Sequence, residues 1–257
     1  MKNVDTTILG IRRMTMAVNR ILYLVKISKQ EYLKKTVRKG NFYMNTCESF
    51  RKMAIEKEGG LVGDLHECSF PVGTKFGSEY SQIISLNEDD TESIAMCCAA
   101  NYCIYCTYAV FAEAFPNCAI IPKEVFTGII GNDDPTQYGV LLFKKPAAII
   151  DKIIAELSIR GLSGRCDRIS YDDHKFCSQY PFLSKDYILD LCFHKRKDFE
   201  GQNEYRIATI NTEGGAIDDL YIGELKDDEY EMIPIQPDRA LCIETKAGFL
   251  KADFSWV

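Results

Sequence analysis

The stretch that decides the fold class runs Ile21-Leu-Tyr-Leu-Val-Lys-Ile27, then residues 28–39, Gly40 and Asn41-Phe-Tyr-Met-Asn-Thr46. The first segment is a β-rich apolar run with the length of one strand. Residues 28–39 are predicted to form a helix, because Ser28 stands three residues before a glutamate in the spacing of a capping box. Gly40 follows a basic last turn, where glycine commonly ends a helix, and residues 41–46 are typical of a second strand. We therefore expect a strand, a helix and a strand in succession, with the two strands adjacent in one sheet.

Helix and strand patterns alternate along the rest of the chain. Further helices are predicted at residues 4–20, 46–55, 122–130, 146–157 and 185–194. Further strands are predicted at residues 82–86, 94–99, 102–108, 138–143, 165–171, 204–210, 220–222, 229–235 and 240–243. The glycine-rich residues 58–77 are predicted to be a loop. No repeat, low-complexity tract or long linker divides the chain, so we expect one α/β (α+β) domain over residues 1–257, with a single mixed sheet and a strand-rich tail at 211–257.

Composition places the chain among ordinary globular proteins. Of its 257 residues, 46% are apolar and 26% are charged, which allows a sizeable core without metals or disulfides. The formal net charge of -6 predicts no general affinity for duplex nucleic acid, although a local basic patch could still bind nucleic acid. No apolar stretch approaches the roughly 20 residues needed to span a bilayer, and no leader pattern opens the chain. We therefore expect neither a membrane span nor a membrane partner.

The 11 cysteines are an odd number, and several lie in the apolar run from Cys97 to Cys106 without the spacing of a disulfide framework. We expect all of them to be reduced, buried thiols of a cytoplasmic protein. The pair Cys103-Ile-Tyr-Cys106 could be half of a zinc site or a redox pair, but none of the three histidines is spaced to complete a zinc site. Buried core is therefore favoured, and no metal site is predicted. The motif Gly63-Asp-Leu-His-Glu67 could supply a general base or half a metal site, with a structural turn as the favoured interpretation.

The segment from His194 to Arg206 is the strongest candidate for chemistry. A basic cluster at 194–197 is followed by Gln202 and by Glu204, which opens the strand 204–210. Because side chains alternate along a strand, Gln202 and Glu204 are expected on one side, and Tyr205 and Ile207 on the other. Glu204 could bind a ribose hydroxyl and stabilise an oxocarbenium-like centre, while Gln202 positions the acceptor. The alternative is a charged strand face without chemistry, beside solvated basic residues.

The segments LYLVKIS, KKTVRKGNFYMNTCESFRK and GDLHE, followed much later by FHKRKDFEGQNEYRI, resemble a family of uncharacterised phage and prophage proteins with an FxxQxEYR signature. This resemblance covers most of residues 22–210. The last segment is also similar to the Gln-x-Glu element of ADP-ribosyltransferases, including the DarT class that modifies DNA. The opening strand, helix, glycine and strand resemble the start of that fold. Where those enzymes carry Arg or His on the first strand to hold NAD, this strand offers Tyr23 and Lys26.

The resemblance implies an ADP-ribosyltransferase-like fold that binds NAD between its two halves. Glu204 would be the catalytic residue, and Gln202 would assist it. Tyr43 would stack on the nicotinamide or adenine, and Arg51 would hold phosphates. Lys26 and Arg206 complete the predicted NAD-binding set.

Two functional hypotheses follow. The first is a phage- or prophage-derived protein of host–virus conflict, in antiviral defence or counter-defence, that binds NAD or a related nucleotide and for which ADP-ribose transfer is the candidate activity. The second is a non-enzymatic inhibitor or binding module that sequesters a protein partner or a nucleotide signal. A metal-dependent nuclease is not supported, because no Asp/Glu-x-Lys pattern stands convincingly on a predicted strand.

Overall fold

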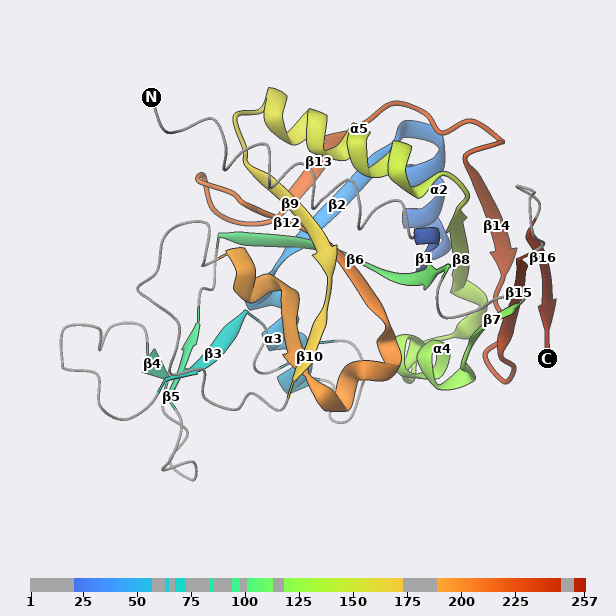
Figure 1. Cartoon of the computed structure of the whole chain (residues 1–257), viewed down its shortest axis with the longest axis horizontal. Helices are drawn as coiled ribbons and strands as arrows, with labels where there is room; N and C mark the ends of the chain where they lie inside the picture. Colours follow the sequence, from blue (N-terminus) through green and yellow to red (C-terminus); the bar gives the residue numbers. More distant parts are fainter. Residues whose placement is uncertain are drawn as a thin grey trace.

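The computed structural model of the chain describes residues 21–56, 63–64, 68–72, 84–85, 94–97, 101–112, 118–172, 189–245 and 252–257. Over these residues the fold is mixed α/β and rich in strands, with helices on both faces of a central sheet (Figure 1). None of the described helices combines the length and the apolar character needed to cross a membrane. The predicted helix at 4–20 lies outside the described residues.

The central sheet has eight strands. They are β1 (Ile21–Lys29), β2 (Asn41–Thr46), β6 (Tyr102–Phe111), β8 (Tyr138–Phe143), β9 (Gly164–Arg168), β12 (Glu204–Ile210), β13 (Ile217–Tyr221) and β14 (Tyr230–Pro234). The strand order is β13-β2-β6-β1-β8-β14, while β12 pairs with β6, and β9 pairs with β12. All of these pairings are antiparallel. Strands from the opening, the middle and the tail of the chain therefore share one sheet.

β1 and β2 do not pair with each other, so the prediction that these two strands are adjacent in the sheet is wrong. Both pair with the same edge of β6, because β12 pairs along its other edge. β1 pairs with residues 108–111 at one end of β6, and β2 pairs with Cys103 and Ile104 at the other end. Because β1 and β2 are both antiparallel to β6, they run parallel to each other. Successive strands that run in the same direction need a crossover connection, and the helix between β1 and β2 provides it.

That crossover helix, α2 (Gln30–Lys39), ends as predicted. Gly40 adopts the left-handed conformation with φ 63°, and its backbone N–H donates to the Thr36 carbonyl at 2.9 Å. The predicted start of the helix is wrong by two residues. Ser28 belongs to β1, because β1 continues its pairing with β8 as far as Lys29, and it therefore does not cap the helix.

Helices α2 and α5 (Pro146–Ile159) cover one face of the central sheet, and α4 (Lys123–Ile130) lies on the opposite face (Figure 1). Leu33 of α2 and Ile149 of α5 belong to the core of the first face. Phe126 of α4 belongs to the second core, together with a small sheet. This sheet comprises β16 (Ala252–Trp256), β15 (Leu241–Thr245) and β7 (Cys118–Ile121).

α3 (Cys47–Glu56) packs against β2 and β6 and begins as predicted. Its start is capped by Thr46, whose Oγ1 accepts the backbone N–H of Ser49 at 3.1 Å. Phe50 and the first residue of the helix contribute to a third apolar cluster, which also contains Ile104 of β6. The helix therefore covers the end of β6 to which β2 is paired.

Smaller elements correct two predictions. β3 (Ser69–Val72) lies within the predicted loop at 58–77 and pairs with β5 (Ile94–Cys97), which also pairs with β4 (Ile84–Ser85). The end of the predicted helix at 185–194 is a short 3₁₀ helix, η3 (Leu191–Phe193), followed by strand β11 (His194–Arg196). β11 is parallel to β10 (Ser170–Asp172), and a second 3₁₀ helix, η4 (Lys197–Gln202), leads into β12.

Two disulfides overturn the prediction that every cysteine is free. Cys47 is bonded to Cys68, and Cys118 is bonded to Cys242. The fold brings the partners, 21 and 124 residues apart in sequence, to Cα–Cα distances of 6.2 and 6.5 Å, which lie within the range of a disulfide. An odd count of cysteines shows only that at least one thiol is unpaired, so it does not exclude such pairs.

Candidate functional site

A pocket of about 300 Å³ opens where β1 leaves β6. β1 pairs with β6 only as far as Val25, and its remaining residues to Lys29 pair with β8 alone. At the other end of β6, β2 takes over only at Ile104. The edge of β6 between these two pairings therefore faces a gap, and residues 106–108 line the pocket there. α3 and α4 contribute the apolar side of the wall, including Phe50 and Ile129.

A buried cluster of charged side chains on β12 and β11 forms the polar side of the pocket. Arg206 Nε donates to Glu204 Oε1 at 2.6 Å, and Arg206 Nη2 donates to Glu204 Oε2 at 3.3 Å. Lys195 Nζ donates to Glu204 Oε2 at 3.2 Å and to Gln202 Oε1 at 2.5 Å. Glu204, Arg206 and Lys195 are 5%, 1% and 5% exposed. All four residues line the pocket.

The alternation predicted for β12 is confirmed where the structure describes it. Tyr205 and Ile207 lie in the core on the α2 and α5 side of the sheet, whereas Glu204 and Arg206 line the pocket. Gln202 belongs to η4 and not to the strand, but Lys195 joins its side chain to that of Glu204. The predicted amide and carboxylate therefore share one site, linked through a lysine.

The charge state of Glu204 follows from its neighbours. Burial alone would raise the pKa of Glu204, but the positive charges of Arg206 and Lys195 outweigh burial and hold this pKa well below its usual range. Glu204 is therefore a carboxylate that accepts hydrogen bonds and has no proton to donate. Its negative charge is already balanced by two buried cations, which restricts how strongly it could stabilise a further positive centre.

Lys26 projects from β1 at the gap. Its Nζ donates to the carbonyl of Cys106 at 2.8 Å and lies 4.7 Å from the centre of the Tyr105 ring. Burial lowers the pKa of Lys26, while Cys106 and Glu204 act in the opposite direction. An ammonium has three N–H donors, and the bond to Cys106 uses one of them. Lys26 is therefore a cation placed to bind an anion in the pocket.

Tyrosine and lysine side chains also line the pocket. Tyr32 of α2 and Tyr138 of β8 both line it, and the Tyr138 hydroxyl donates to Asp133 Oδ2 at 2.6 Å. Lys29 Nζ lies 3.6 Å from the same Asp133 oxygen, so its charge is locally balanced. Lys29 therefore adds little net charge to the pocket, whose remaining cations are Lys26 and those of the buried cluster.

Two of the six residues predicted to act in the site are not brought to the pocket. Tyr43 is 50% exposed on β2, because Phe42 and Met44 take the buried positions of that strand. Its hydroxyl lies 3.4 Å from Asn45 Oδ1. Arg51 lies on α3, but its neighbour Phe50 is the residue that turns toward the pocket.

Sequence reasoning missed Lys195 as a member of the site. The run His194-Lys-Arg-Lys197 carries no internal mark that distinguishes one basic residue from the next. The structure buries Lys195 under the pocket, while the side chain of Arg196 reaches Asp64, with Nε 3.4 Å from Oδ1. Asp64 is itself buried, so the described part of the motif at 63–67 holds a structural ion pair.

The pocket therefore combines the cations of Lys26, Lys195 and Arg206 with one carboxylate, beside apolar and aromatic side chains. An excess of positive charge in a concave, partly apolar site favours an anionic organic ligand. No protein-family model, curated protein or solved structure matches this chain, so the geometry of this pocket is the basis on which a function can be assigned.

Proposed function

We propose that the pocket binds NAD or a related nucleotide. The observation that carries the proposal is the placement of three cations around one carboxylate in a pocket that tyrosine side chains also line. Phosphate groups would be attracted by the cations, and a base could stack on an aromatic ring. The volume of about 300 Å³ is at the lower end of the roughly 300–1,000 Å³ usual for ligand sites. This size suits a mononucleotide, or one half of a dinucleotide with the other half outside.

Lys26 and Lys195 are the residues we assign to phosphate. Among the described residues, Lys26 donates one hydrogen bond, to Cys106, and Lys195 donates two, to Gln202 and Glu204. An ammonium has three donors, so each retains donor capacity toward the pocket. Arg206 is more fully engaged, because it donates to both oxygens of Glu204 and also to the Cys192 carbonyl at 2.7 Å. Its role in the proposal is to fix Glu204 and to supply charge from the floor of the pocket.

ADP-ribose transfer is the second candidate function, within an ADP-ribosyltransferase-like fold. It is favoured by the ionised Glu204 and by Gln202 in the same pocket, the two residues that the Gln-x-Glu resemblance singles out. The balancing of Glu204 by two cations favours the non-enzymatic alternative, a module that binds a nucleotide signal without turning it over. A role in host–virus conflict rests on the phage-family resemblance alone.

A binding experiment tests the first proposal. Isothermal titration with NAD, ADP-ribose and AMP should detect at least one ligand, and a ligand at about 100 times its Kd should stabilise the fold by about 2.7 kcal/mol. Lys26→Met should weaken binding by tenfold or more, because it removes a cation from the pocket. Lys34→Met is the matched control, since Lys34 is exposed on α2. The proposal fails if none of the three nucleotides binds, or if Lys26→Met and Lys34→Met bind equally well.

Turnover separates the two candidates once binding is established. Release of nicotinamide from NAD by the wild-type protein, or labelling of a nucleic-acid or protein substrate from radiolabelled NAD, would support transfer. Stoichiometric binding of NAD that is recovered intact after prolonged incubation would support the binding module.

A further inference from the structure

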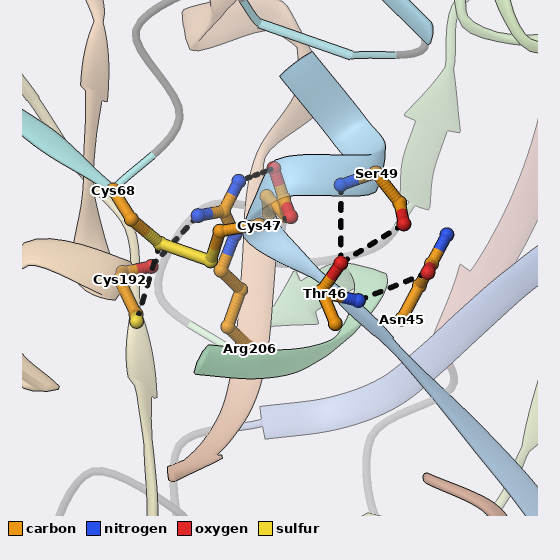
Figure 2. The surroundings of a disulfide bond; sticks show 8 residues. Asn45, Thr46, Cys47, Ser49, Cys68, Cys192 and Arg206 are labelled. Atoms are coloured by element: carbon orange, nitrogen blue, oxygen red, sulfur yellow. Dashed lines mark hydrogen bonds and ion pairs between the residues drawn. A yellow bond between two sulfur atoms is a disulfide. The ribbon is translucent and has the colours of Figure 1, made fainter. Parts of the chain in front are cut away.

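Three buried cysteine sulfurs converge behind the charged cluster (Figure 2). Cys47 is the first residue of α3, Cys68 directly precedes β3, and Cys192 lies in η3. All three side chains are fully buried, and their Sγ atoms lie within 4.8 Å of one another. Cys47 and Cys68 form a disulfide, and Cys192 Sγ lies 3.3 Å from Cys68 Sγ.

We propose that this cluster is a zinc site when its disulfide is reduced. Zinc binds thiolates at about 2.3 Å in tetrahedral geometry, which places neighbouring sulfurs about 3.8 Å apart. Sulfurs already within 4.8 Å of one another reach that spacing through small side-chain adjustments. Three protein ligands leave a fourth position on the ion, which zinc fills with water or another ligand.

The origin of the three sulfurs favours a metal over an ordinary apolar contact. Cys47 and Cys68 are 21 residues apart, and Cys192 is 124 residues beyond Cys68. Three separate chain segments therefore deliver one soft ligand each to a single point. The Cys118–Cys242 disulfide has no third described cysteine grouped with it in this way and provides an internal comparison.

The charges around the cluster also suit the ion. A dithiol, which is itself oxidised to a disulfide, or a phosphine with one water molecule, which is oxidised to the phosphine oxide, supplies the two electrons and two protons that convert the Cys47–Cys68 disulfide to two thiols. Zinc then displaces three thiol protons, so that three thiolates and one dication carry a net charge of -1. Arg206 donates from Nη1 to the Cys192 carbonyl at 2.7 Å and so places a guanidinium next to the cluster (Figure 2). Such an outer contact both orients a ligand residue and offsets the residual negative charge.

The test uses the full chain, reduced with a phosphine under anaerobic conditions and titrated with Zn²⁺ or Co²⁺. Native mass spectrometry should show one zinc ion held by this cluster, and Co²⁺ should give the intense near-ultraviolet absorption of thiolate ligation. The triple variant Cys47→Ser/Cys68→Ser/Cys192→Ser should lose one bound ion per chain. Cys166→Ser is the matched control, because Cys166 is also a buried cysteine but lies on β9 in another core cluster.

A second measurement avoids reliance on variants that fold poorly. In the reduced wild-type protein, zinc should slow alkylation of Cys47, Cys68 and Cys192 by tenfold or more, while Cys103 and Cys166 react at unchanged rates. The proposal is overturned if reduced protein binds no zinc, if zinc leaves these three cysteines unprotected, or if the triple variant binds as many ions as the Cys166→Ser control.

Discussion

Replacing Glu204 by glutamine is expected to cost about 3–5 kcal/mol of unfolding free energy, the usual penalty for removing one partner of a buried ion pair. Glu204 is 5% exposed and accepts hydrogen bonds from Arg206 and Lys195, which are themselves buried. Glutamine keeps the size of the side chain but removes the charge that balances both cations. For a protein of this length each kcal/mol lowers Tm by about 2–4 °C, so Tm should fall by roughly 6–20 °C.

Urea unfolding followed by circular dichroism measures this loss directly. Glu200→Gln is the matched control, because Glu200 is exposed in η4, and it should change the unfolding free energy by no more than about 0.5 kcal/mol. The double variant Glu204→Gln/Arg206→Met should lose less than the sum of the two single variants, since the residues are in direct contact. If Glu204→Gln is as stable as Glu200→Gln, the ion pairs of Glu204 in the buried cluster do not stabilise the fold.

Three other perturbations have signs fixed by the structure. Burial raises the pKa of Glu204, but its two cations more than offset this and hold the pKa below its usual 4.5, so its contribution is complete above that pH and is lost as pH falls through the folded pKa. Urea titrations from about pH 5 to about pH 3 should therefore show a steeper loss of stability in wild type than in Glu204→Gln, and parallel curves would contradict this. Gly40→Ala should lower the unfolding free energy by more than the about 1–2 kcal/mol of left-handed backbone strain, because its Cβ would overlap the Gly223 carbonyl. Gly161→Ala, with φ 72° and open space around the added Cβ, should cost the strain alone. Equal losses of unfolding free energy in urea melts would refute the overlap. Burial lowers the pKa of Lys26, so its positive charge is lost earlier as pH rises. AMP affinity measured by titration calorimetry should therefore begin to fall at a lower pH in wild type than in Lys26→Arg, whose guanidinium stays charged. Identical dependence of AMP affinity on alkaline pH in the two proteins would show that Lys26 does not bind the nucleotide.

The sequence predicted helices and strands well where the type of a single residue, or a short local pattern, determines the backbone conformation. Gly40 ends α2 because a left-handed residue is needed there, and the predicted strand at 204–210 has the bounds of β12. The opposite placement of Glu204 and Tyr205 followed from strand alternation alone. Four of the six predicted site residues line one pocket: Lys26 on β1, Gln202 in η4, and Glu204 and Arg206 on β12.

What could not be predicted depends on contacts between distant segments. Nothing in residues 21–46 indicates that β1 and β2 pair with one edge of β6, which begins at Tyr102, and not with each other. The disulfide of Cys118 with Cys242 likewise joins strands of a sheet whose pairing is not encoded locally. Lys195 could not be distinguished from the other basic residues of its run, because its burial is imposed by the pairing of β11 with β10.

The hydrogen bond from Lys26 to Cys106 joins β1 to β6 at a point where the backbone pairing of the two strands has ended. The Cys106 carbonyl faces the gap between β1 and β2, and the ammonium takes the position that a backbone amide of a further strand would occupy. A bound phosphate that drew the Lys26 ammonium away would break this hydrogen bond to the Cys106 carbonyl. The free energy of that lost bond would offset part of the attraction between the ammonium and the phosphate. Ligand binding would then make the edge of β6 at Cys106 more mobile and the buried charged cluster less mobile. Amide hydrogen exchange near Cys106 would accelerate in the bound state, opposite to the protection expected elsewhere around an occupied pocket.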